Sequence, residues 1–419
     1  MRRKIWVISA ALVLLAFQAV PTLAQNIPAR ESAQSLDGFT LALKHYPTPG
    51  GTPLLLIHGL AQNDRIWDSP IERYNFAQIL QAHGYDVWIG NLRGAGTRGF
   101  RSDTPAGPHH WTVDDYAIND LPALVDKVYQ ETGKKPWLIG HSLAAWVFTG
   151  YLGGIEYTPD GQVRPNKKRG AERQAGLAGM ITIAGVFSLA WEHSVENFMK
   201  DPLRSELDYY HSNYELELLA KNKPLFWIIP RLPGLPLGWI GSVLGLRFDQ
   251  IPLIGKKLTE IYSGFQSQII ETPVFSMFYS PSNTNAEMVK NHVADGFEDL
   301  GPHLVEQLAN AVNTHETTSY YHLDRPKQAY KYSDVLKTLK LPLLFMGGEK
   351  DRLASAFQIY HEGYLKSGGR GDQGSYNDKV FVAVPNAGHL DILTGENAAE
   401  ITIPALERFI DDHADRYHQ

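Results

Sequence analysis

Residues 137–144 read Trp-Leu-Ile-Gly-His-Ser-Leu-Ala, and this stretch decides the fold. Three apolar residues run directly into Gly-His-Ser, and a helical apolar pattern follows from Trp146 to Tyr151. A strand, a tight turn and a helix in this order are the setting in which a G-x-S-x-G-like motif forms a nucleophile elbow. Ala144 stands where glycine is commoner, so the motif is imperfect. The alternative is that Ser142 only caps an ordinary helix N-terminus.

Short apolar runs alternate with helical patterns on both sides of this stretch. Continuous apolar runs that end in glycine loops are typical of buried strands in a parallel sheet. Predicted strands are 53–57, 85–90, 137–139, 179–185, 341–348 and 380–384, after a hairpin around Asp37-Gly38. Predicted helices are 71–82, 121–132 and about 404–412, besides the one that follows Ser142. The order predicts an α/β fold, a mostly parallel sheet with helices on both faces.

The alternation stops between about residues 187 and 338. This segment is rich in aromatic residues, but proline and glycine recur too often for a transmembrane helix. Amphipathic helices are predicted near 287–294 and 302–313. We therefore predict a fold core made of residues 25–186 and 339–419, with 187–338 as a large, mainly helical insertion. Its apolar residues form a core of their own, or make a lid that lines a substrate tunnel or touches a lipid surface. The two readings are compatible, since a lid needs its own core.

The first 24 residues have the composition of a signal peptide. Arg2, Arg3 and Lys4 precede an apolar run from Ile5 to Ala16, and a small residue, Ala24, precedes a polar one. We predict cleavage after Ala24 and a secreted or periplasmic protein. An uncleaved membrane anchor is the alternative, but the apolar stretch is shorter than the roughly 20 residues of a spanning helix.

The overall composition excludes several classes of function. The chain has 419 residues, 43% of them hydrophobic, and a formal net charge of −6, which would become −9 without the first 24 residues. Scattered basic residues and a negative net charge argue against nucleic acid as a partner; the run 167–169 is predicted to be a solvated loop. There are no cysteines, so a thiol nucleophile is excluded.

No pattern indicates a cofactor or a metal. The spacing of Gly94, Gly96 and Gly99 matches neither a dinucleotide fingerprint nor a Walker loop, and we expect a tight surface loop there. His-Glu-x-x-His is absent, and the pair at 109–110 has no spaced third ligand. We expect neither a cofactor nor a required metal ion.

A serine nucleophile needs a base and an acid, and both should follow later strands. An imidazole must accept the hydroxyl proton, and a carboxylate must orient that imidazole. Asp351 follows the 341–348 strand and His389 follows the 380–384 strand, which is the order Ser, Asp, His. Glu349 is the nearer rival for the acid and Glu192 a distant one.

Backbone amides are expected to stabilise the oxyanion. Leu143 follows the nucleophile at a helix N-terminus, and Leu60 follows the His-Gly pair after an early strand, so their N–H groups are the candidates. His141 is expected to be structural because its side chain points away from a sharp elbow. His58 is expected to shape its loop.

Taken together, these motifs resemble the acid lipase family of the alpha/beta-hydrolase fold, which includes gastric and lysosomal lipases. The resemblance lies in the motifs at 58–60, 84–94, 120–123, 140–142, 347–351 and 389–391. It implies triad roles for Ser142, Asp351 and His389, and oxyanion roles for Leu60 and Leu143. It also implies neutral lipid esters as substrates. The sequence departs from the family at Ser-Leu-Ala, in the divergent insertion and in its lack of cysteines.

We therefore expect an exported serine hydrolase that cleaves carboxylic esters of apolar acyl chains through an acyl-enzyme. The expected partner is a lipid or another apolar ester, with possible contact between the lid and a lipid surface. A short-chain carboxylesterase or a polyester or amide hydrolase is the alternative within enzymes. A non-catalytic lipid-binding protein on the same scaffold is the alternative outside them.

Overall fold

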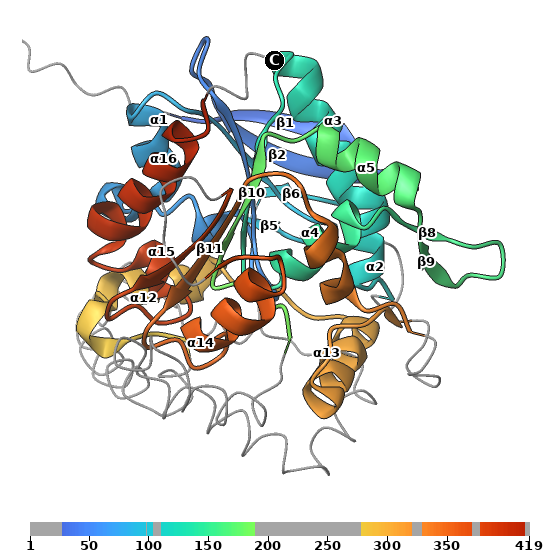
Figure 1. Ribbon diagram of the computed structural model, residues 1–419. Helices are drawn as coiled ribbons and strands as arrows, with labels where there is room; N and C mark the ends of the chain where they lie inside the picture. Colours follow the sequence, from blue (N-terminus) through green and yellow to red (C-terminus); the bar gives the residue numbers. More distant parts are fainter. Residues whose placement is uncertain are drawn as a thin grey trace, which may run out of the picture.

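A central sheet of eight strands organises the molecule (Figure 1). The computed structural model describes residues 27–97, 99–103, 110–188, 278–320, 329–370 and 378–414. The predicted signal peptide and most of the predicted insertion lie outside these residues. In spatial order the strands are β1 Ala29–Gln34, β2 Thr40–Tyr46, β4 Asp86–Gly90, β3 Pro53–Ile57, β7 Trp137–His141, β10 Gly179–Ile183, β11 Leu343–Gly348 and β12 Lys379–Val384.

The sheet is antiparallel at one edge and parallel elsewhere. β1 pairs with β2, and β2 with β4, in antiparallel register, whereas every later pairing is parallel. The predicted hairpin is present, with its turn between Gln34 and Thr40. Two further hairpins are small: β5 Gly96–Thr97 with β6 Phe100–Arg101, and β8 Ile155–Tyr157 with β9 Val163–Pro165.

Helices cover both faces of the sheet, as the alternation predicted. Within the described residues, the α-helices are α1 Phe76–Ala82, α2 Val113–Asp115, α3 Leu121–Thr132, α4 Ala144–Leu152, α5 Lys167–Ala175, α12 Ala286–Asp295, α13 Pro302–Thr314, α14 Ala356–Gln358, α15 Asp391–Thr394 and α16 Ile403–Asp411. α1 and α16 lie on one side of the sheet, and α3 and α4 on the other (Figure 1). π-Helices span Tyr116–Asp120, Ile359–Leu365 and Ala398–Thr402, and 3-10 helices span Asp64–Ile66, Glu72–Tyr74, Pro281–Asn283 and Tyr332–Thr338.

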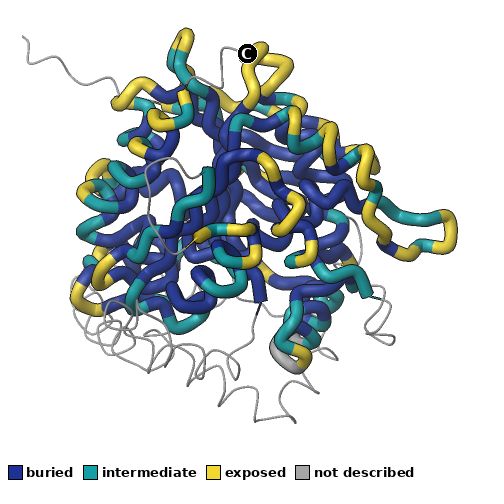
Figure 2. The backbone as a smooth tube through the Cα atoms, viewed as in Figure 1, coloured by how far each residue is buried: buried dark blue, intermediate teal, exposed yellow. Residues whose placement is uncertain are grey.

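The parallel strands are buried on both faces, which explains their continuous apolar runs. In β3, Leu54 and Leu56 belong to the hydrophobic cluster under α1 and α16, whereas Leu55 and Ile57 belong to the cluster under α3 and α4. Successive side chains of a strand point to opposite faces, so one run of apolar residues supplies both cores. Figure 2 shows the buried sheet between exposed outer segments.

The strand register brings the functional loops to one edge of the sheet. Ile57 pairs with Gly140, and His141 pairs with Ile183, so β3, β7 and β10 end at the same level. On the far side of β10, β11 and β12 are paired up to Gly348 and Val384. Loops after parallel strands therefore meet at this carboxyl edge, where ligands of such folds usually bind.

Two local predictions were wrong. The basic run at 167–169 opens helix α5, whose first turn is capped because Asn166 Oδ1 accepts a hydrogen bond from Arg169 N. The loop at 91–97 is buried, and not at the surface. Its Arg93 guanidinium is 3% exposed and pairs with the buried carboxylate of Asp120, and also with Asp37 at the surface.

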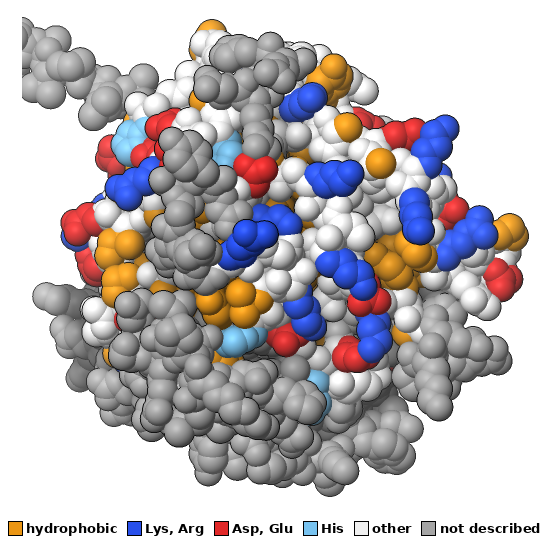
Figure 3. All heavy atoms as spheres, viewed as in Figure 1, with side chains coloured by type: hydrophobic (Ala, Val, Ile, Leu, Met, Phe, Trp, Pro, Cys, Tyr) orange, Lys and Arg blue, Asp and Glu red, His pale blue; other side chains and the backbone are white. Residues whose placement is uncertain are grey.

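The described end of the predicted insertion is helical. α12 and α13 lie close to the two amphipathic segments predicted from sequence. None of the helices within the described residues is long and apolar enough to cross a membrane. On the face seen in Figure 3, basic and acidic side chains are interspersed, without one dominant charged patch among the described residues.

Candidate active site

Ser142 occupies a strained turn between β7 and α4. Its φ is +54°, a value that non-glycine residues rarely adopt. The turn is held by the hydrogen bond from Ser142 N to Ile183 O at 3.0 Å and by one from Ala145 N to Ser142 O at 3.1 Å. Strain of this kind persists where the surrounding structure enforces it, and it is often found at functional sites. It also shows that Ser142 is not the extended residue of an ordinary helix cap.

Close packing explains the small residues that flank Ser142. A Cβ atom on Gly140 would lie 2.4 Å from the Phe148 ring and 2.6 Å from the Cβ of Ala144. Glycine is therefore required at 140. Ala144, which stands where glycine is commoner, is fully buried and fits because Gly140 has no side chain.

The structure brings together the three side chains predicted for the triad. His389 Nε2 lies 2.9 Å from Ser142 Oγ, and His389 Nδ1 lies 2.8 Å from Asp351 Oδ2. All three residues are buried, with exposures of 7% for Ser142, 4% for His389 and 0% for Asp351. The imidazole thus bridges the hydroxyl and the carboxylate, although the three residues come from different loops.

Asp351, rather than Glu349, faces the imidazole. Its second oxygen, Oδ1, accepts hydrogen bonds from Leu353 N and Ala354 N, both at 2.8 Å, which fix the carboxylate plane. Glu349 instead accepts a hydrogen bond from Asn386 N at 3.2 Å through Oε2. The distant rival, Glu192, lies outside the described residues.

The loop that carries His389 is held by a buried carboxylate that sequence reasoning did not single out. Asp391 accepts hydrogen bonds from Ser280 N at 2.8 Å, Gly388 N at 3.0 Å and Asn283 Nδ2 at 2.7 Å. Burial, partly offset by these donors, raises the pKa of Asp391 to about 6. Ser280 and Asn283 come from the end of the predicted insertion, so this segment braces the loop of the proposed base.

The two candidate oxyanion amides lie in neighbouring loops. Leu60 follows β3 and precedes Ala61, whose φ of +53° marks a sharp turn. Leu143 is the residue before α4. Within the described residues, neither amide donates a backbone hydrogen bond. Both residues line a small cavity of about 20 Å³ together with His58 and Leu300.

His141 and His58 have partners other than Ser142, in line with the structural roles expected for them. His58 Nε2 accepts a hydrogen bond from Leu92 N at 3.1 Å, and burial lowers the pKa of His58 to about 4. His141 is fully buried; its Nδ1 lies 2.9 Å from Gln62 Oε1 and its Nε2 lies 2.8 Å from His389 O. Burial, with a smaller effect of His389, lowers the pKa of His141 well below its usual value.

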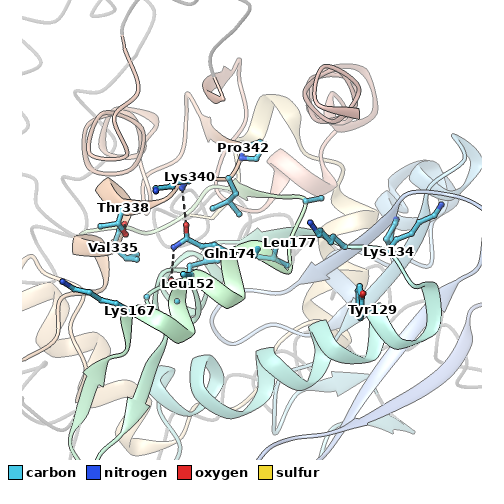
Figure 4. A pocket seen from close by; sticks show the side chains of 18 of the residues that line it. Tyr129, Lys134, Leu152, Lys167, Gln174, Leu177, Val335, Thr338, Lys340 and Pro342 are labelled. Atoms are coloured by element: carbon cyan, nitrogen blue, oxygen red, sulfur yellow. Dashed lines mark hydrogen bonds between the residues drawn. The ribbon is translucent and has the colours of Figure 1, made fainter. Parts of the chain in front are cut away.

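A large cavity among the described residues lies away from this site. It has a volume of about 1280 Å³ and is lined at the starts of the parallel strands by residues that include Pro53, Leu177 and Pro342 (Figure 4). Lys134 and Lys340 also line it. Because Ser142 and His389 follow the ends of their strands, this cavity is at the opposite edge of the sheet.

A family model identifies the class of protein. A model of the alpha/beta hydrolase family matches residues 54–401, and the chain belongs to this family. The predicted fold class is thereby confirmed.

Within the family, the chain is similar to lipases over about a quarter of its length. It is 37% identical over 121 residues to triacylglycerol lipase 1 of Arabidopsis thaliana, which covers 26% of this chain and 30% of that protein. It is 33% identical over 118 residues to gastric triacylglycerol lipase of Homo sapiens, or 25% of this chain and 30% of that protein. The match thus spans under a third of these relatives, and it confirms the predicted resemblance to gastric lipases.

A solved structure, a putative aryl esterase from Burkholderia cenocepacia, is 17% identical and covers 92% of this chain and 100% of that chain, with a TM-score of 0.48.

Proposed function

We propose that the protein hydrolyses carboxylic esters with Ser142 as nucleophile, His389 as general base and acid, and Asp351 as the group that orients the imidazole. One observation carries the proposal: His389 lies within hydrogen-bond distance of both Ser142 Oγ and Asp351 Oδ2. A hydroxyl becomes a competent nucleophile only when a base accepts its proton, and this arrangement provides that base.

The reaction proceeds in two halves. His389 Nε2 takes the proton of Ser142 as Oγ attacks the ester carbonyl, and then gives it to the departing alcohol. A water molecule next loses a proton to His389 and attacks the acyl-enzyme, which releases the acid and restores Ser142. Asp351 holds Nδ1–H of the ring and stabilises the imidazolium in both halves. The N–H groups of Leu60 and Leu143 stabilise the negative oxygen of each tetrahedral intermediate.

We propose esters of apolar acyl chains as substrates. Relatives that match about a quarter of the chain are named triacylglycerol lipases. The segment 187–338, rich in aromatic residues, would be the insertion that selects the acyl chain, between core parts 25–186 and 339–419. The basic and then apolar residues 1–24 support export to the periplasm or the medium, with cleavage after Ala24.

Labelling with a fluorophosphonate probe and hydrolysis of p-nitrophenyl esters of graded chain length test the proposal. The wild type should be labelled and should hydrolyse esters, whereas Ser142→Ala should lose both properties and keep the thermal unfolding midpoint of the wild type. Ser367→Ala is the matched control, because Ser367 is also buried but its hydroxyl donates to Tyr364 O.

The outcomes separate the alternatives. Turnover retained in Ser142→Ala would overturn the assignment of the nucleophile. Preference for short, soluble esters would favour a short-chain carboxylesterase, and preference for polyester or amide substrates would favour that class of hydrolase. Lipid binding without labelling would favour a non-catalytic lipid-binding protein.

A further inference from the structure

A buried side chain, Gln62, links the two loops on either side of Ser142. Gln62 is 3% exposed, and its Oε1 accepts a hydrogen bond from Gly59 N at 3.0 Å. The same oxygen lies 2.9 Å from His141 Nδ1. On its other side, the His141 ring reaches the backbone of His389, with Nε2 2.8 Å from the carbonyl oxygen. A continuous set of polar contacts therefore runs from the loop of Leu60 to the loop of His389, beneath Ser142.

We propose that Gln62 and His141 are positioning residues, which fix the Leu60 amide relative to Ser142 and His389 so that it is aimed at the oxyanion before substrate arrives. We call the two side chains the Gln62–His141 brace. The inference rests on the proposed hydrolase function, because it concerns the oxyanion of that reaction. Preorganised donors stabilise a developing charge without reorganising at the moment of reaction.

The contacts on both sides of Leu60 show why its amide is the group that the brace controls. The amide of Gly59, just before Leu60, is held by Gln62 Oε1. The carbonyl of Ala61, just after it, accepts a hydrogen bond from Glu298 N at 2.9 Å. With both neighbours held, the peptide group that carries Leu60 N–H has little freedom to turn.

The outer side of the loop has an independent anchor. Glu298 accepts hydrogen bonds from Asn63 Nδ2 at 2.8 Å and Gly96 N at 3.0 Å, and pairs with Arg101 at 2.7 Å. Loss of the Gln62–His141 brace should therefore leave the loop attached and the protein folded, while the direction of the Leu60 amide becomes less well defined. This separation allows the brace to be tested in an active, folded enzyme.

The chemistry of His141 identifies an informative second variant. Both of its ring nitrogens face oxygen acceptors, and a neutral imidazole has one N–H. A carboxylate in place of the Gln62 amide would still accept from Gly59 N–H, and would favour a second proton on the ring, which could then donate to both oxygens. Gln62→Glu should therefore preserve the brace, whereas Gln62→Met, of similar length, should remove it.

The experiment measures kcat and KM with p-nitrophenyl butyrate, and the inhibition constant of an alkyl trifluoromethyl ketone, whose adduct with serine carries an oxyanion. In Gln62→Met we expect kcat to fall about 10- to 100-fold, less than the loss of a whole oxyanion donor. KM should stay within about twofold, and the inhibition constant should rise with the loss of kcat, as for an interaction made only in the transition state. Gln62→Glu should recover most of kcat.

The matched control is Gln307→Met. Gln307 is 1% exposed, accepts a hydrogen bond from Val113 N and donates one to Thr318 O, both at 2.9 Å. The Gln307→Met variant therefore loses buried hydrogen bonds of the same kind as Gln62→Met. Titration of active sites with the fluorophosphonate probe corrects each rate for misfolded protein.

Two results would overturn the inference. One is a kcat for Gln62→Met within twofold of the Gln307→Met value. The other is an effect on KM alone. If the wild type is active and its activity depends on Ser142, either result rejects the Gln62–His141 brace and leaves the hydrolase proposal intact. A wild type that neither reacts with the probe nor hydrolyses esters rejects both.

Discussion

Gly59 and Ser142, which belong to loops after different strands, are so close that a Cβ on Gly59 would lie 2.8 Å from the Cβ of Ser142. The same added atom would lie 2.8 Å from Gln62 Oε1. These distances are shorter than any normal contact between such atoms. The nucleophile turn and the oxyanion loop can therefore approach each other only because residue 59 has no side chain.

We predict that Gly59→Ala separates these two loops. The substitution should lower kcat for ester hydrolysis by at least about 100-fold, because the Leu60 amide moves away from the position of the oxyanion. It should also destabilise the protein by about 1–3 kcal/mol through overpacking. Steady-state kinetics and urea unfolding measure the two effects. Gly176→Ala is the control, since its added Cβ would meet no atom closer than 3.5 Å. Equal activity of the two variants would contradict this reading of the contact.

Asp351→Asn should produce a folded protein with the wrong imidazole tautomer. Asn can keep the oxygen that accepts from Leu353 N and Ala354 N, but its amide NH₂ then faces His389 Nδ1. The ring would carry its proton on Nε2 and could not accept one from Ser142. We expect kcat to fall roughly 10⁴-fold, the order known for such a change.

Glu349→Gln serves as the comparison for that prediction. Glu349 is bonded to Asn386 N and not to the ring, so its replacement should change kcat by no more than about threefold. A larger loss of kcat in Glu349→Gln than in Asp351→Asn would show that the acid has been assigned to the wrong residue.

Ala144→Gly should leave the chemistry nearly intact and weaken the fold. Ala144 is the first residue of α4 and is fully buried, and the structure already accommodates its methyl group. Glycine near a helix start would cost up to about 1 kcal/mol through added freedom of the unfolded chain and lost packing. Thermal or urea unfolding measures this cost, and kcat should stay within about twofold. A marked rise in kcat would mean that the methyl group obstructs the elbow.

His292→Phe should make the protein less sensitive to acid. His292 is 3% exposed, and its Nε2 has no hydrogen-bond partner among the described residues. Burial, with a smaller effect of Arg65, lowers its pKa to about 3. The unfolded chain therefore binds a proton below about pH 6.5 while the folded protein does not, so stability falls as the pH drops from 6.5 towards 3.

Urea unfolding at pH 7 and pH 5 measures this effect. The free energy of unfolding of the wild type should be about 2 kcal/mol lower at pH 5 than at pH 7 because of His292. The variant should lack this contribution. Identical losses of unfolding free energy in the two proteins would show that His292 is protonated in the fold.

The sequence predicts the parts of this molecule that depend on local pattern. The buried strands are continuous apolar runs because both faces of the sheet are covered, and α3 has the predicted limits, Leu121–Thr132. The chain order of Ser142, Asp351 and His389 after their strands was enough to select three side chains that the structure places in contact.

The supports of the site could not be predicted in this way. Gln62 contacts His141, which lies 79 positions away in the sequence, and Asp391 accepts a hydrogen bond from Ser280 N, which lies 111 positions away. Contacts between side chains and distant backbone leave no periodicity in the sequence, and one Gln or Asp in a loop resembles any other. Helix α5 was missed for a related reason, because its charged residues give it no apolar stripe and its start depends on the cap from Asn166.

The contacts of residues 278–300 set a limit on exchanging parts between relatives. Ser280 and Asn283 hold the loop of His389, and Glu298 holds the loop of Leu60. The last part of the predicted insertion therefore supports the active-site loops of the core. A chimera that replaced 187–338 as one cassette would remove these contacts together with the segment proposed to select the acyl chain. A junction placed before residue 278 would change specificity while retaining the supports of the reaction.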